Sequence, residues 1–448
     1  MQINNTYSNM KKIKLNAILV LFLGIFAAGI SNTAQTASAK SSEDRFDKIP
    51  GQYIVVLKDK GADTDSETDN IAKTHKLERI HTYNRAIKGF AARINEAELE
   101  KIKNDPRVEF VAEDRAVYIS NPAFGSESSN KASSVSKKPA PQTQPPQTVP
   151  TGIDRVNAEN LLNKGAGIGV AVIDTGIELS HPDLKGNIIA NKNCLSSVKN
   201  GNDDNGHGTH TAGTIAALDN NIGVVGAAPE AKLIAVKVLN RNGSGTWSSV
   251  ICGIDWVTAN AAKYNIKVAN MSLGGAGASD NNCGSTNNDP LHKAICNSRD
   301  AGVTYVVAAG NENKSASLSV PASYDDAVIT VSALADSDGA LGGLGSPTLY
   351  GADDTFATFS NFGNIVDLGA PGVDIYSTYI GGKYATLSGT SMAAPHVSGV
   401  ATLYIKNNPS STWDQVRDVL KALAENLGFG HTDPSDLHSE PVVRADSL

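Results

Sequence analysis

Three short motifs place residues that could do nucleophilic chemistry far apart along the chain. Asp174 ends the apolar run VIDTG, His207 opens HGTHTAGT, and Ser391 lies among small residues in GTSMAAPH. A histidine that is oriented by a buried carboxylate can take the proton of a serine hydroxyl, which makes that oxygen a nucleophile. The three residue types therefore predict nucleophilic catalysis, provided that the fold brings them together.

The VIDTG motif has two alternative interpretations. It could be a strand that ends in a turn, or the active segment of an aspartic peptidase, which needs two such aspartates sharing one proton. No second apolar copy occurs, since Ser337-Asp338-Gly339 lacks the apolar residues in front. The alternation of strands and helices along the chain also disfavours the aspartic class, which is all-β.

Two histidines stand three residues apart in the second motif. His207 and His210 could in principle bind a metal ion, but no glutamate lies between them as the H-E-x-x-H zinc motif requires. We expect His207, at the start of a helix, to face a cleft. We expect His210 to be a hydrogen-bonded histidine of the core.

Ser391 and Asn311 could together bind a negatively charged oxygen. Thr390 can cap a helix that runs on through Val400 and Tyr404, which places Ser391 at a helix N-terminus with outward, unpaired N–H groups. Asn311 follows an apolar strand in AAGNEN and can donate from its side-chain amide. Taken alone, Ser391 would be a capping serine, and Asn311 fits a turn asparagine as well as it fits an oxyanion donor.

Alternating strands and helices must position these residues. The candidate strands are 169–174, 233–239, 268–273, 303–310 and 327–333, with helical stretches such as HGTHTAGTIAAL and SSVICGIDWVTANAAKYN between them. The strands are continuous apolar runs, so both of their faces are covered. The pattern predicts an α/β fold, a parallel sheet with helices on both faces, whose functional groups lie beyond the carboxyl ends of the strands.

A smaller domain is predicted over residues 50–120. Its strands are GQYIVVLK, ERIHTY, GFAARI and RVEFVAEDRAVYI, and its helices are 65–76, begun by a capping aspartate, and 95–105, capped by Asn95. The order β-α-β-β-α-β is typical of a ferredoxin-like α+β domain. Residues 121–146 are rich in Ser, Pro, Lys and Gln, and we interpret them as a linker.

The N-terminus has the features of a secretion signal. Three lysines precede an apolar run from Leu15 to Ile30, and small residues follow it up to Ala37-Ser38-Ala39. The run is short for a membrane anchor, the alternative, which needs about 20 residues. We therefore expect residues 1–39 to be a cleaved signal peptide and the protein to be secreted.

Composition and cysteine content agree with an exported globular protein. The chain has 448 residues, a formal net charge of −7 and 40% hydrophobic residues, which favours a sizeable core and disfavours nucleic-acid binding. Its four cysteines allow three pairings. The cysteines are Cys194, Cys252, Cys283 and Cys296. Closeness in the chain favours a bridge between Cys283 and Cys296, and no C-x-x-C motif occurs.

The motifs VIDTG, HGTHTAGT, AAGN and GTSMAAPH, in this order, resemble those of the subtilisin family of serine peptidases. The likeness covers about residues 147–424, leaving 425–448 as a C-terminal tail, and the small domain resembles the family's inhibitory propeptide. The resemblance implies that Asp174 orients His207, that His207 takes the proton of Ser391, and that Asn311 and the Ser391 N–H bind the oxyanion. The alternative is an inactive relative that only binds peptides.

The resemblance further implies a secreted, monomeric endopeptidase that hydrolyses polypeptides and is made as an autoprocessed zymogen. Its own propeptide would inhibit it, with self-cleavage near Ser120 or Asn121 and a second trimming near Gln147. No nucleic acid is expected as a partner, and no membrane after signal cleavage. Compared with subtilisins, the stretch between Asn311 and Pro321 is short, and Glu312 within it could accept a basic substrate side chain.

Two further sets of residues follow from the resemblance. Two backbone segments would pair with an extended substrate, and their residues are Gly243, Ser244, Gly245, Ser272, Leu273 and Gly274. Six oxygen donors would hold a structural Ca²⁺ ion, and they come from Gln147, Asp183, Leu218, Asn220, Ile222 and Val224. The alternatives are ordinary loops for the first set and a plain Asn/Gly turn for the second.

Overall fold

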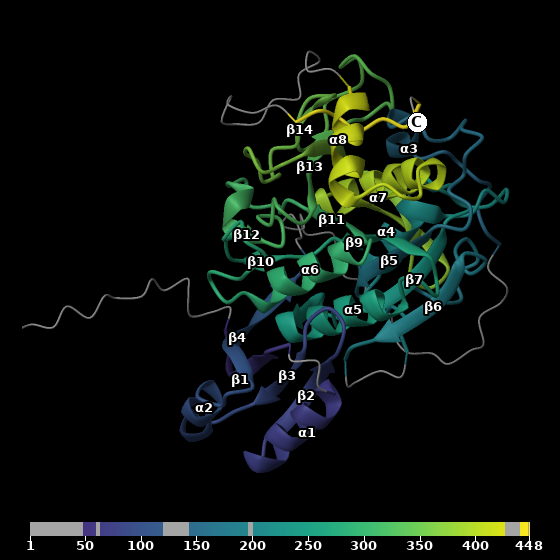
Figure 1. Cartoon of the computed structure of the whole chain (residues 1–448). Helices are drawn as coiled ribbons and strands as arrows, with labels where there is room; N and C mark the ends of the chain where they lie inside the picture. The colour runs from purple at the N-terminus through teal and green to yellow at the C-terminus, as the bar shows by residue number, and fades with distance from the viewer. Residues whose placement is uncertain (1–47, 60–62, 120–142, 196–199, 426–439, 447) are drawn as a thin grey trace, which may run out of the picture. The chain divides into compact units, whose positions relative to one another are not determined.

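The computed structural model describes residues 48–59, 63–119, 143–195, 200–425, 440–446 and 448 (Figure 1). The predicted signal peptide and most of the predicted linker lie outside these residues. Within the described ranges, no helix is long and apolar enough to cross a membrane.

The small N-terminal domain has the predicted order of elements. These are β1 (Lys48–Leu57), α1 (Thr64–Thr74), β2 (Glu78–Tyr83), β3 (Gly89–Arg93), α2 (Glu96–Lys103) and β4 (Val108–Tyr118). Asn95 caps α2 as predicted, since its side chain accepts from the N–H of Glu98. The capping aspartate of α1 is Asp63 rather than Asp65, because the Asp63 carboxylate accepts from Asp65 N–H and from the Ser66 hydroxyl.

Strand β1 is central in an antiparallel sheet and shows the two-residue alternation of a strand. Val55 and Leu57 pack in one core with Ile71 of α1 and Ile102 of α2. Ile54 and Val56 point to the opposite face, where they join a core formed mostly by peptidase residues. The sheet is therefore covered by its own helices on one face and by the peptidase domain on the other.

The larger domain is built around a mostly parallel sheet. Its strands are β5 (Gly169–Asp174), β6 (Ile188–Asn193), β7 (Lys232–Lys237), β9 (Ile266–Met271), β11 (Thr304–Ala308), β13 (Ile329–Ala335), β14 (Thr355–Phe356) and β15 (Leu368–Pro371). The order is β14-β13-β11-β9-β5-β7-β6, with β15 also paired to β13, and only the β13–β14 pair is antiparallel. This is the parallel sheet that the apolar runs predict.

Helices cover both faces of this sheet (Figure 1). The helices are α3 (Thr151–Arg155), α4 (His207–Ala216), α5 (Trp247–Asn260), α6 (Pro290–Asp300), α7 (Thr390–Asn407) and α8 (Trp413–Leu423). Val170 and Val172 of β5 belong to the core that contains α4 and α7, whereas Ala171 and Ile173 belong to the core of α5 and α6. The central strand that ends at Asp174 is thus buried on both faces.

Short elements complete the domain. They are β8 (Ser244–Thr246), β10 (Gly275–Ala276), β12 (Ser319–Val320), β16 (Ile375–Tyr379), β17 (Lys383–Leu387) and a 3₁₀ turn at Ala316–Leu318. Part of the predicted C-terminal tail also packs into the domain. Val442 and Val443 are buried, and Gly369 exchanges backbone hydrogen bonds with Pro441 and Val443.

Candidate active site

The Asp174 carboxylate and the His207 imidazole form a buried pair. His207 Nδ1 lies 2.8 Å from Asp174 Oδ1 and 2.9 Å from Oδ2, and both side chains are almost fully buried. Asp174 is the last residue of β5, and its carbonyl accepts from the N–H groups of Val238 and Leu239. The neighbouring strand therefore fixes the backbone that carries the carboxylate.

The loop before α4 fixes the imidazole in the same way. Asp203 accepts from the N–H groups of Asn205, Gly206 and Thr209, and the Asn205 side chain accepts from the N–H of His207. Gly206 has a φ of 114°, a left-handed conformation that glycine adopts without strain. His207 begins the helix, as the sequence predicts.

Ser391 lies in the first turn of α7, and its hydroxyl is not bonded to His207. Ser391 Oγ donates to the Ser272 carbonyl at 3.3 Å, while the Ser272 hydroxyl donates to the Ser391 carbonyl at 2.9 Å. His207 Nε2 is buried and has no hydrogen-bond partner among the described residues. The structure therefore joins Asp174 to His207 by a hydrogen bond, and no hydrogen bond joins His207 to Ser391.

The prediction that Thr390 caps α7 is wrong. The cap position is Gly389, and Thr390 is the first helical residue. The reason is that the AAGN loop binds Thr390: its N–H donates to Asn311 Oδ1 at 2.8 Å and its hydroxyl donates to the same oxygen at 2.9 Å. The Thr390 hydroxyl also accepts from the N–H of Gly310.

These contacts orient the Asn311 amide. Because Asn311 Oδ1 is held by Thr390, the Nδ2 group is the end of the amide that can donate elsewhere. The N–H of Ser391 is one of the first four of its helix, which have no partner within the helix. Asn311 is 9% exposed, so this region is close to water without being open to it.

His210 is a core histidine, as predicted. Its Nε2 lies 3.0 Å from the Ile375 carbonyl and 3.1 Å from the Ala385 carbonyl, and the side chain is fully buried. Burial, followed by the field of His207, lowers the pKa of His210 to about 3. The neutral ring is thus engaged by backbone groups on β16 and β17.

Strand β4 of the small domain lies on the predicted substrate-binding segments. Val117 pairs with Gly245 and Tyr118 with Ser244, and Tyr118 exchanges two backbone hydrogen bonds of 2.9 Å with Gly274. The N–H of Ile119 donates to the Gly243 carbonyl at 2.9 Å.

Gly243 is a position where glycine is needed. Its φ is 72°, and a Cβ there would come within 2.5 Å of Ile119 Cδ1. Of the other predicted residues, Leu273 and Ser272 are buried, and Ser272 contacts Ser391 rather than β4.

A pocket of about 370 Å³ lies beside this strand. It is lined by Ile119, Gly275, Ala309, Gly310, Glu312, Lys314 and Val320, among others. Glu312 Oε2 accepts from Asn361 Nδ2 at 2.8 Å and lies 3.9 Å from Lys314 Nζ. Asn361 had no signal in the sequence, because only the fold brings it next to Glu312, whereas Lys314 follows Glu312 by two positions in the chain.

Two carboxylates hold the small domain against α5. Asp114, on β4, accepts from the N–H of Ser248 in the first turn of α5. Asp255, on α5, accepts from three consecutive N–H groups, those of Asn84, Arg85 and Ala86. Sequence reasoning missed both residues, since a lone aspartate on a strand or a helix carries no motif.

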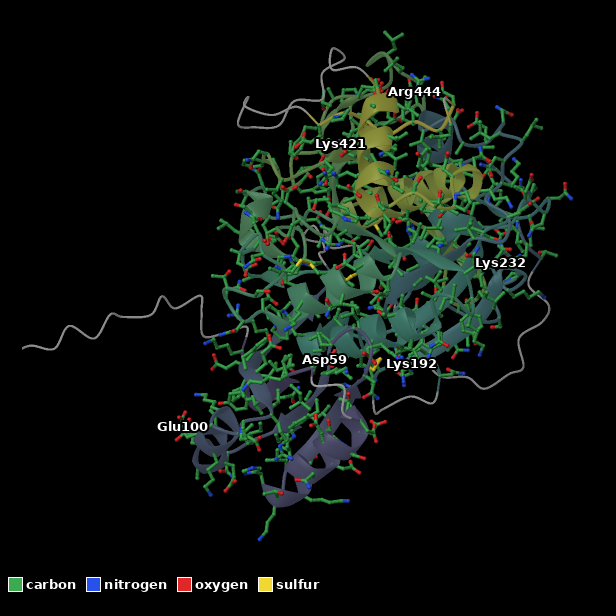
Figure 2. All side chains as sticks on the ribbon, viewed as in Figure 1. Asp59, Glu100, Lys192, Lys232, Lys421 and Arg444 are labelled. Carbon is green, nitrogen blue, oxygen red and sulfur yellow. A yellow bond between two sulfur atoms is a disulfide. The ribbon has the colours of Figure 1, made fainter. Side chains whose placement is uncertain are left out.

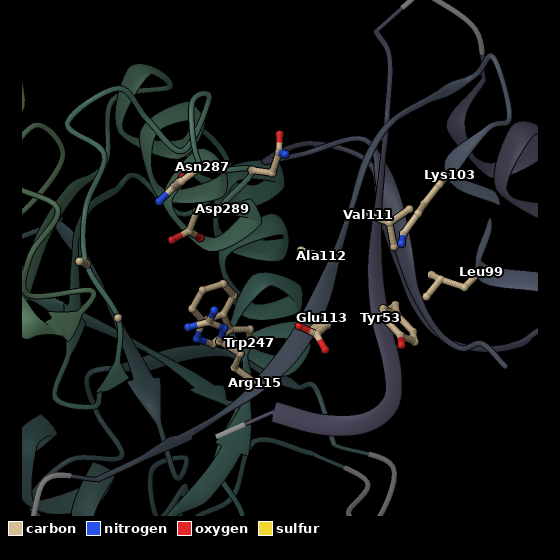
Figure 3. A pocket seen from close by; sticks show the side chains of 13 residues that line it. Tyr53, Leu99, Lys103, Val111, Ala112, Glu113, Arg115, Trp247, Asn287 and Asp289 are labelled. Carbon is tan, nitrogen blue, oxygen red and sulfur yellow. The ribbon is translucent and has the colours of Figure 1, made fainter. Parts of the chain in front are cut away.

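The same interface encloses a pocket of about 590 Å³, shown in Figure 3. Tyr53, Val111 and Arg115 line it from the small domain, and Trp247 and Asp289 line it from the peptidase domain (Figure 3). The Arg115 guanidinium lies 5.0 Å from the centre of the Trp247 ring, a cation–π distance.

The structure brings the three segments predicted to bind calcium together. The Gln147 side-chain oxygen accepts from the N–H of Asn220, and Asp183 accepts from the Asn220 side chain at 2.9 Å and from the N–H of Val224 at 3.0 Å. Burial raises the pKa of Asp183 to about 6.

Residues 218–224 form the turn between these contacts. Leu218 N–H donates to the Asp183 carbonyl, and bridges join Pro146 to Ile222 and Thr148 to Val224. The chemistry of these residues fits a hard cation, because the predicted donors are all oxygens. The one carboxylate among them, Asp183, is buried, and the described groups that donate to it are neutral.

Both pairs of cysteines form disulfides (Figure 2). Cys283 is bonded to Cys296, which confirms the bridge that their spacing favours, and Cys194 is bonded to Cys252. The second bridge links the end of β6 to α5, two elements that are distant in the sequence.

Comparisons with known proteins agree with this geometry. The subtilase family model matches residues 165–437, and the peptidase inhibitor I9 model matches residues 52–120. A thermostable alkaline protease from Halalkalibacterium halodurans is 37% identical over 380 residues, which cover 84% of this chain and 87% of that protein. Subtilisin E from Bacillus subtilis is 35% identical over 425 residues, 93% of this chain and 95% of its own.

A solved structure is also similar. A cold-adapted subtilisin-like serine proteinase is 34% identical, covers 66% of this chain and 98% of its own, and superposes with a TM-score of 0.53. The chain therefore belongs to the subtilase family, and it is a serine endopeptidase that carries an I9 peptidase-inhibitor domain ahead of its peptidase domain.

Proposed function

We propose that Asp174, His207 and Ser391 act as one catalytic unit that hydrolyses peptide bonds in proteins. The observation that carries this proposal is the buried Asp174–His207 pair, whose second imidazole nitrogen has no hydrogen-bond partner in the part of the chain that the structure describes. An oriented imidazole with a free Nε2 is what a serine nucleophile needs as a general base.

The proposed reaction begins when Ser391 Oγ attacks the carbonyl carbon of the scissile bond. His207 Nε2 takes the hydroxyl proton, and Asp174 stabilises the imidazolium that forms. The oxyanion accepts from the Ser391 N–H and from Asn311 Nδ2. His207 then protonates the leaving amine, and water hydrolyses the acyl-enzyme with the same base.

Ser391 must turn for this reaction. Its hydroxyl donates to the Ser272 carbonyl at 3.3 Å, a long hydrogen bond that costs little to break. Rotation about the Cα–Cβ bond of Ser391 moves Oγ between staggered positions without moving the helix. We expect substrate binding to accompany this rotation.

The I9 domain supports a zymogen that processes itself. Its last described strand, β4, occupies the backbone segments where an extended substrate would pair, and the contacts of Asp114 and Asp255 anchor it. The predicted cleavage at Ser120 or Asn121 falls on residues that the structure leaves undescribed. It would follow directly after Ile119, which lies against Gly243.

A structural calcium ion is proposed for the Asp183 region. Gln147, Asp183 and Asn220 would bind it through side chains, and the carbonyls of Leu218, Ile222 and Val224 would complete the set. The cation would supply the positive charge that the buried carboxylate does not receive from the described protein groups around it. It has no part in the chemical steps.

Secretion is proposed from the signal-like N-terminus and the two disulfides. Disulfides form and persist in oxidising compartments, which agrees with export. We propose that the enzyme acts outside the cell as a monomer on polypeptides, and Glu312 with its neighbour Lys314 would influence which side chain enters the adjacent pocket.

The proposal is tested by expressing the full chain in a host that can export it and by identifying the protein that accumulates in the medium. The wild-type protein should accumulate in the medium as a shorter chain that begins near Asn121 or Gln147, as N-terminal sequencing would show. The Ser391→Ala protein should accumulate as a longer chain that begins near residue 40. If Ser391→Ala matures to the same N-terminus in a protease-deficient host, self-processing by Ser391 is excluded.

A further inference from the structure

A fully buried lysine lies beside the Asp174–His207 pair. Lys237 is on β7, and its Cα is paired with that of Asp174 on β5. Lys237 Nζ donates to the Thr175 carbonyl at 2.6 Å, to the Asp204 carboxylate at 2.6 Å and to the Leu239 carbonyl at 3.0 Å. The side chain is 0% exposed, and an apolar residue would in general be no less stabilising at such a position.

The acceptors of this ammonium belong to the segments that carry the catalytic pair. Thr175 follows Asp174, and its hydroxyl oxygen accepts from the N–H of Gly208, the residue after His207, at 2.9 Å. Asp204 lies in the loop that leads into His207. One buried charge thus joins the segment after the carboxylate to the segment before the imidazole.

We propose that Lys237 is a positioning residue for peptide hydrolysis. Its ammonium keeps the Asp174 and His207 segments at hydrogen-bonding distance. This inference rests on the proposed function of the pair, since it concerns the same reaction.

Several charged or titratable groups lie on the segments that hold the imidazole or are bonded to those segments. They are Asp174 on β5, Lys237 on β7, Asp203 and Asp204 in the preceding loop, His210 on α4 and Tyr379 on β16. Lys237 is the only permanent cation in this set. Loss of this positive charge in Lys237→Met should therefore move the acid limb of the kcat/KM profile to higher pH.

The Lys237→Met variant tests the proposal on the processed enzyme. Active sites are titrated with a serine-directed phosphonyl fluoride, and kcat and KM for a chromogenic peptide are expressed per titrated site across the pH range. We expect kcat per site to fall by about 10- to 100-fold with KM nearly unchanged, because the pair is displaced rather than the substrate segments. The midpoint of the acid limb of the kcat/KM profile should move to higher pH by roughly 0.5 unit.

Two other variants complete the design. Lys237→Arg keeps the charge and the donors, so it should restore most of kcat and the original acid limb. Lys232→Met makes the same chemical change at the other end of β7, at the residue labelled in Figure 2. Lys232 Nζ donates to the Asn187 side chain, and its loss should leave both quantities unchanged.

The outcomes separate the possibilities. If Lys237→Met only lowers the number of titratable sites, with kcat per site and the acid limb as in the wild type, the residue is structural and the proposal is overturned. If that variant does not fold, Asp204→Asn decides, because Asp204 is 41% exposed and its loss leaves Lys237 uncompensated. The acid limb should then move to lower pH, and an unmoved limb rejects the proposal. A wild-type enzyme that cannot be titrated would instead reject the proposed function.

Discussion

Two buried aspartates of the peptidase domain, Asp174 and Asp183, differ in what the protein provides for their charge. Asp174 faces the His207 imidazole, and the N–H of Thr175 donates to it at 2.6 Å. Among the described residues, the Asp183 carboxylate receives hydrogen bonds only from neutral groups, which are the Asn220 side chain, the Val224 N–H and the Tyr384 hydroxyl. Burial accordingly raises the pKa of Asp183 to about 6.

The catalytic site and the Asp183 region depend on their surroundings in different ways. In the proposed mechanism the catalytic site supplies its own proton acceptor and its own donors for a developing negative charge, so it needs no bound ion. The Asp183 region has converging oxygens and no cationic side chain among the described contacts. A buried carboxylate in such a place is costly unless a cation balances it. The first region should therefore fail through point mutation, and the second through removal of an ion.

The largest effect is expected from Ser391→Ala. Removal of the nucleophile should lower kcat by about 10⁶-fold, the scale known for loss of the catalytic serine in subtilisin, a member of the same family. Ser388→Ala is the matched control, because Ser388 precedes the same helix and bonds to exposed Asp374 instead. Hydrolysis of a peptide nitroanilide measures both. Residual activity above a hundredth of the wild type would contradict the role of Ser391.

The next effect is that of Asn311→Ala on the same assay. Loss of one oxyanion donor should lower kcat by about 10²- to 10³-fold, again the scale known for subtilisin, with KM little changed. The amide also holds Thr390, so a thermal melt must show that the variant is folded. A loss as complete as that of Ser391→Ala would show that Asn311 organises α7 rather than the oxyanion.

Chelation tests the other side of the comparison. In a Ser391→Ala background, which prevents self-digestion, a chelator should lower the free energy of unfolding by about 3 kcal/mol if the ion was present at a hundred times its dissociation constant. The melting temperature should fall by several degrees, as calorimetry would record. Asp183→Asn should show no response. A melting temperature that stays the same at every chelator concentration would contradict the calcium proposal.

The smallest effect concerns the two histidines of α4 and sharpens the contrast between cleft and core. Burial lowers the pKa of His210 to about 3 in the folded chain. As the pH falls through about 6.5, this histidine therefore becomes protonated in the unfolded chain and stays neutral in the folded chain. Stability from this group is present above pH 6.5 and is lost as the pH falls. Between pH 6.5 and 5.5 the loss should be about 1 kcal/mol.

Urea unfolding of Ser391→Ala at these two pH values measures that loss. His210→Gln keeps a donor for the Ile375 and Ala385 carbonyls and does not titrate, so its stability should fall by about 1 kcal/mol less over the same interval. An identical fall in both proteins would mean that His210 does not control this part of the pH dependence.

The sequence was informative where chemistry depends on local pattern. The apolar run ending at Asp174 predicted a strand buried on both faces, and the stretch HGTHTAGTIAAL predicted the helix that begins at His207. The spacing of Cys283 and Cys296 favoured the bridge that forms. Each of these features depends on residues that are close to one another in the sequence.

Features that depend on distant contacts escaped prediction. Thr390 was expected to cap its own helix, yet its hydroxyl serves Asn311, about eighty positions earlier in the chain. Strand β6 is half exposed at the sheet edge and lacks the apolar run that marked the inner strands. Lys237 sits in the middle of an apolar run, and nothing local shows that its charge is buried beside the catalytic pair.

Labelling with a serine-directed phosphonyl fluoride tests the central claim most directly. After digestion, mass spectrometry should find one adduct, on the peptide that contains Ser391, in the processed wild-type enzyme. The same adduct should be almost absent from His207→Ala at equal time and concentration, because the hydroxyl then has no base. An enzyme that hydrolyses polypeptides without an adduct on Ser391, or that is labelled equally fast without His207, would contradict the account.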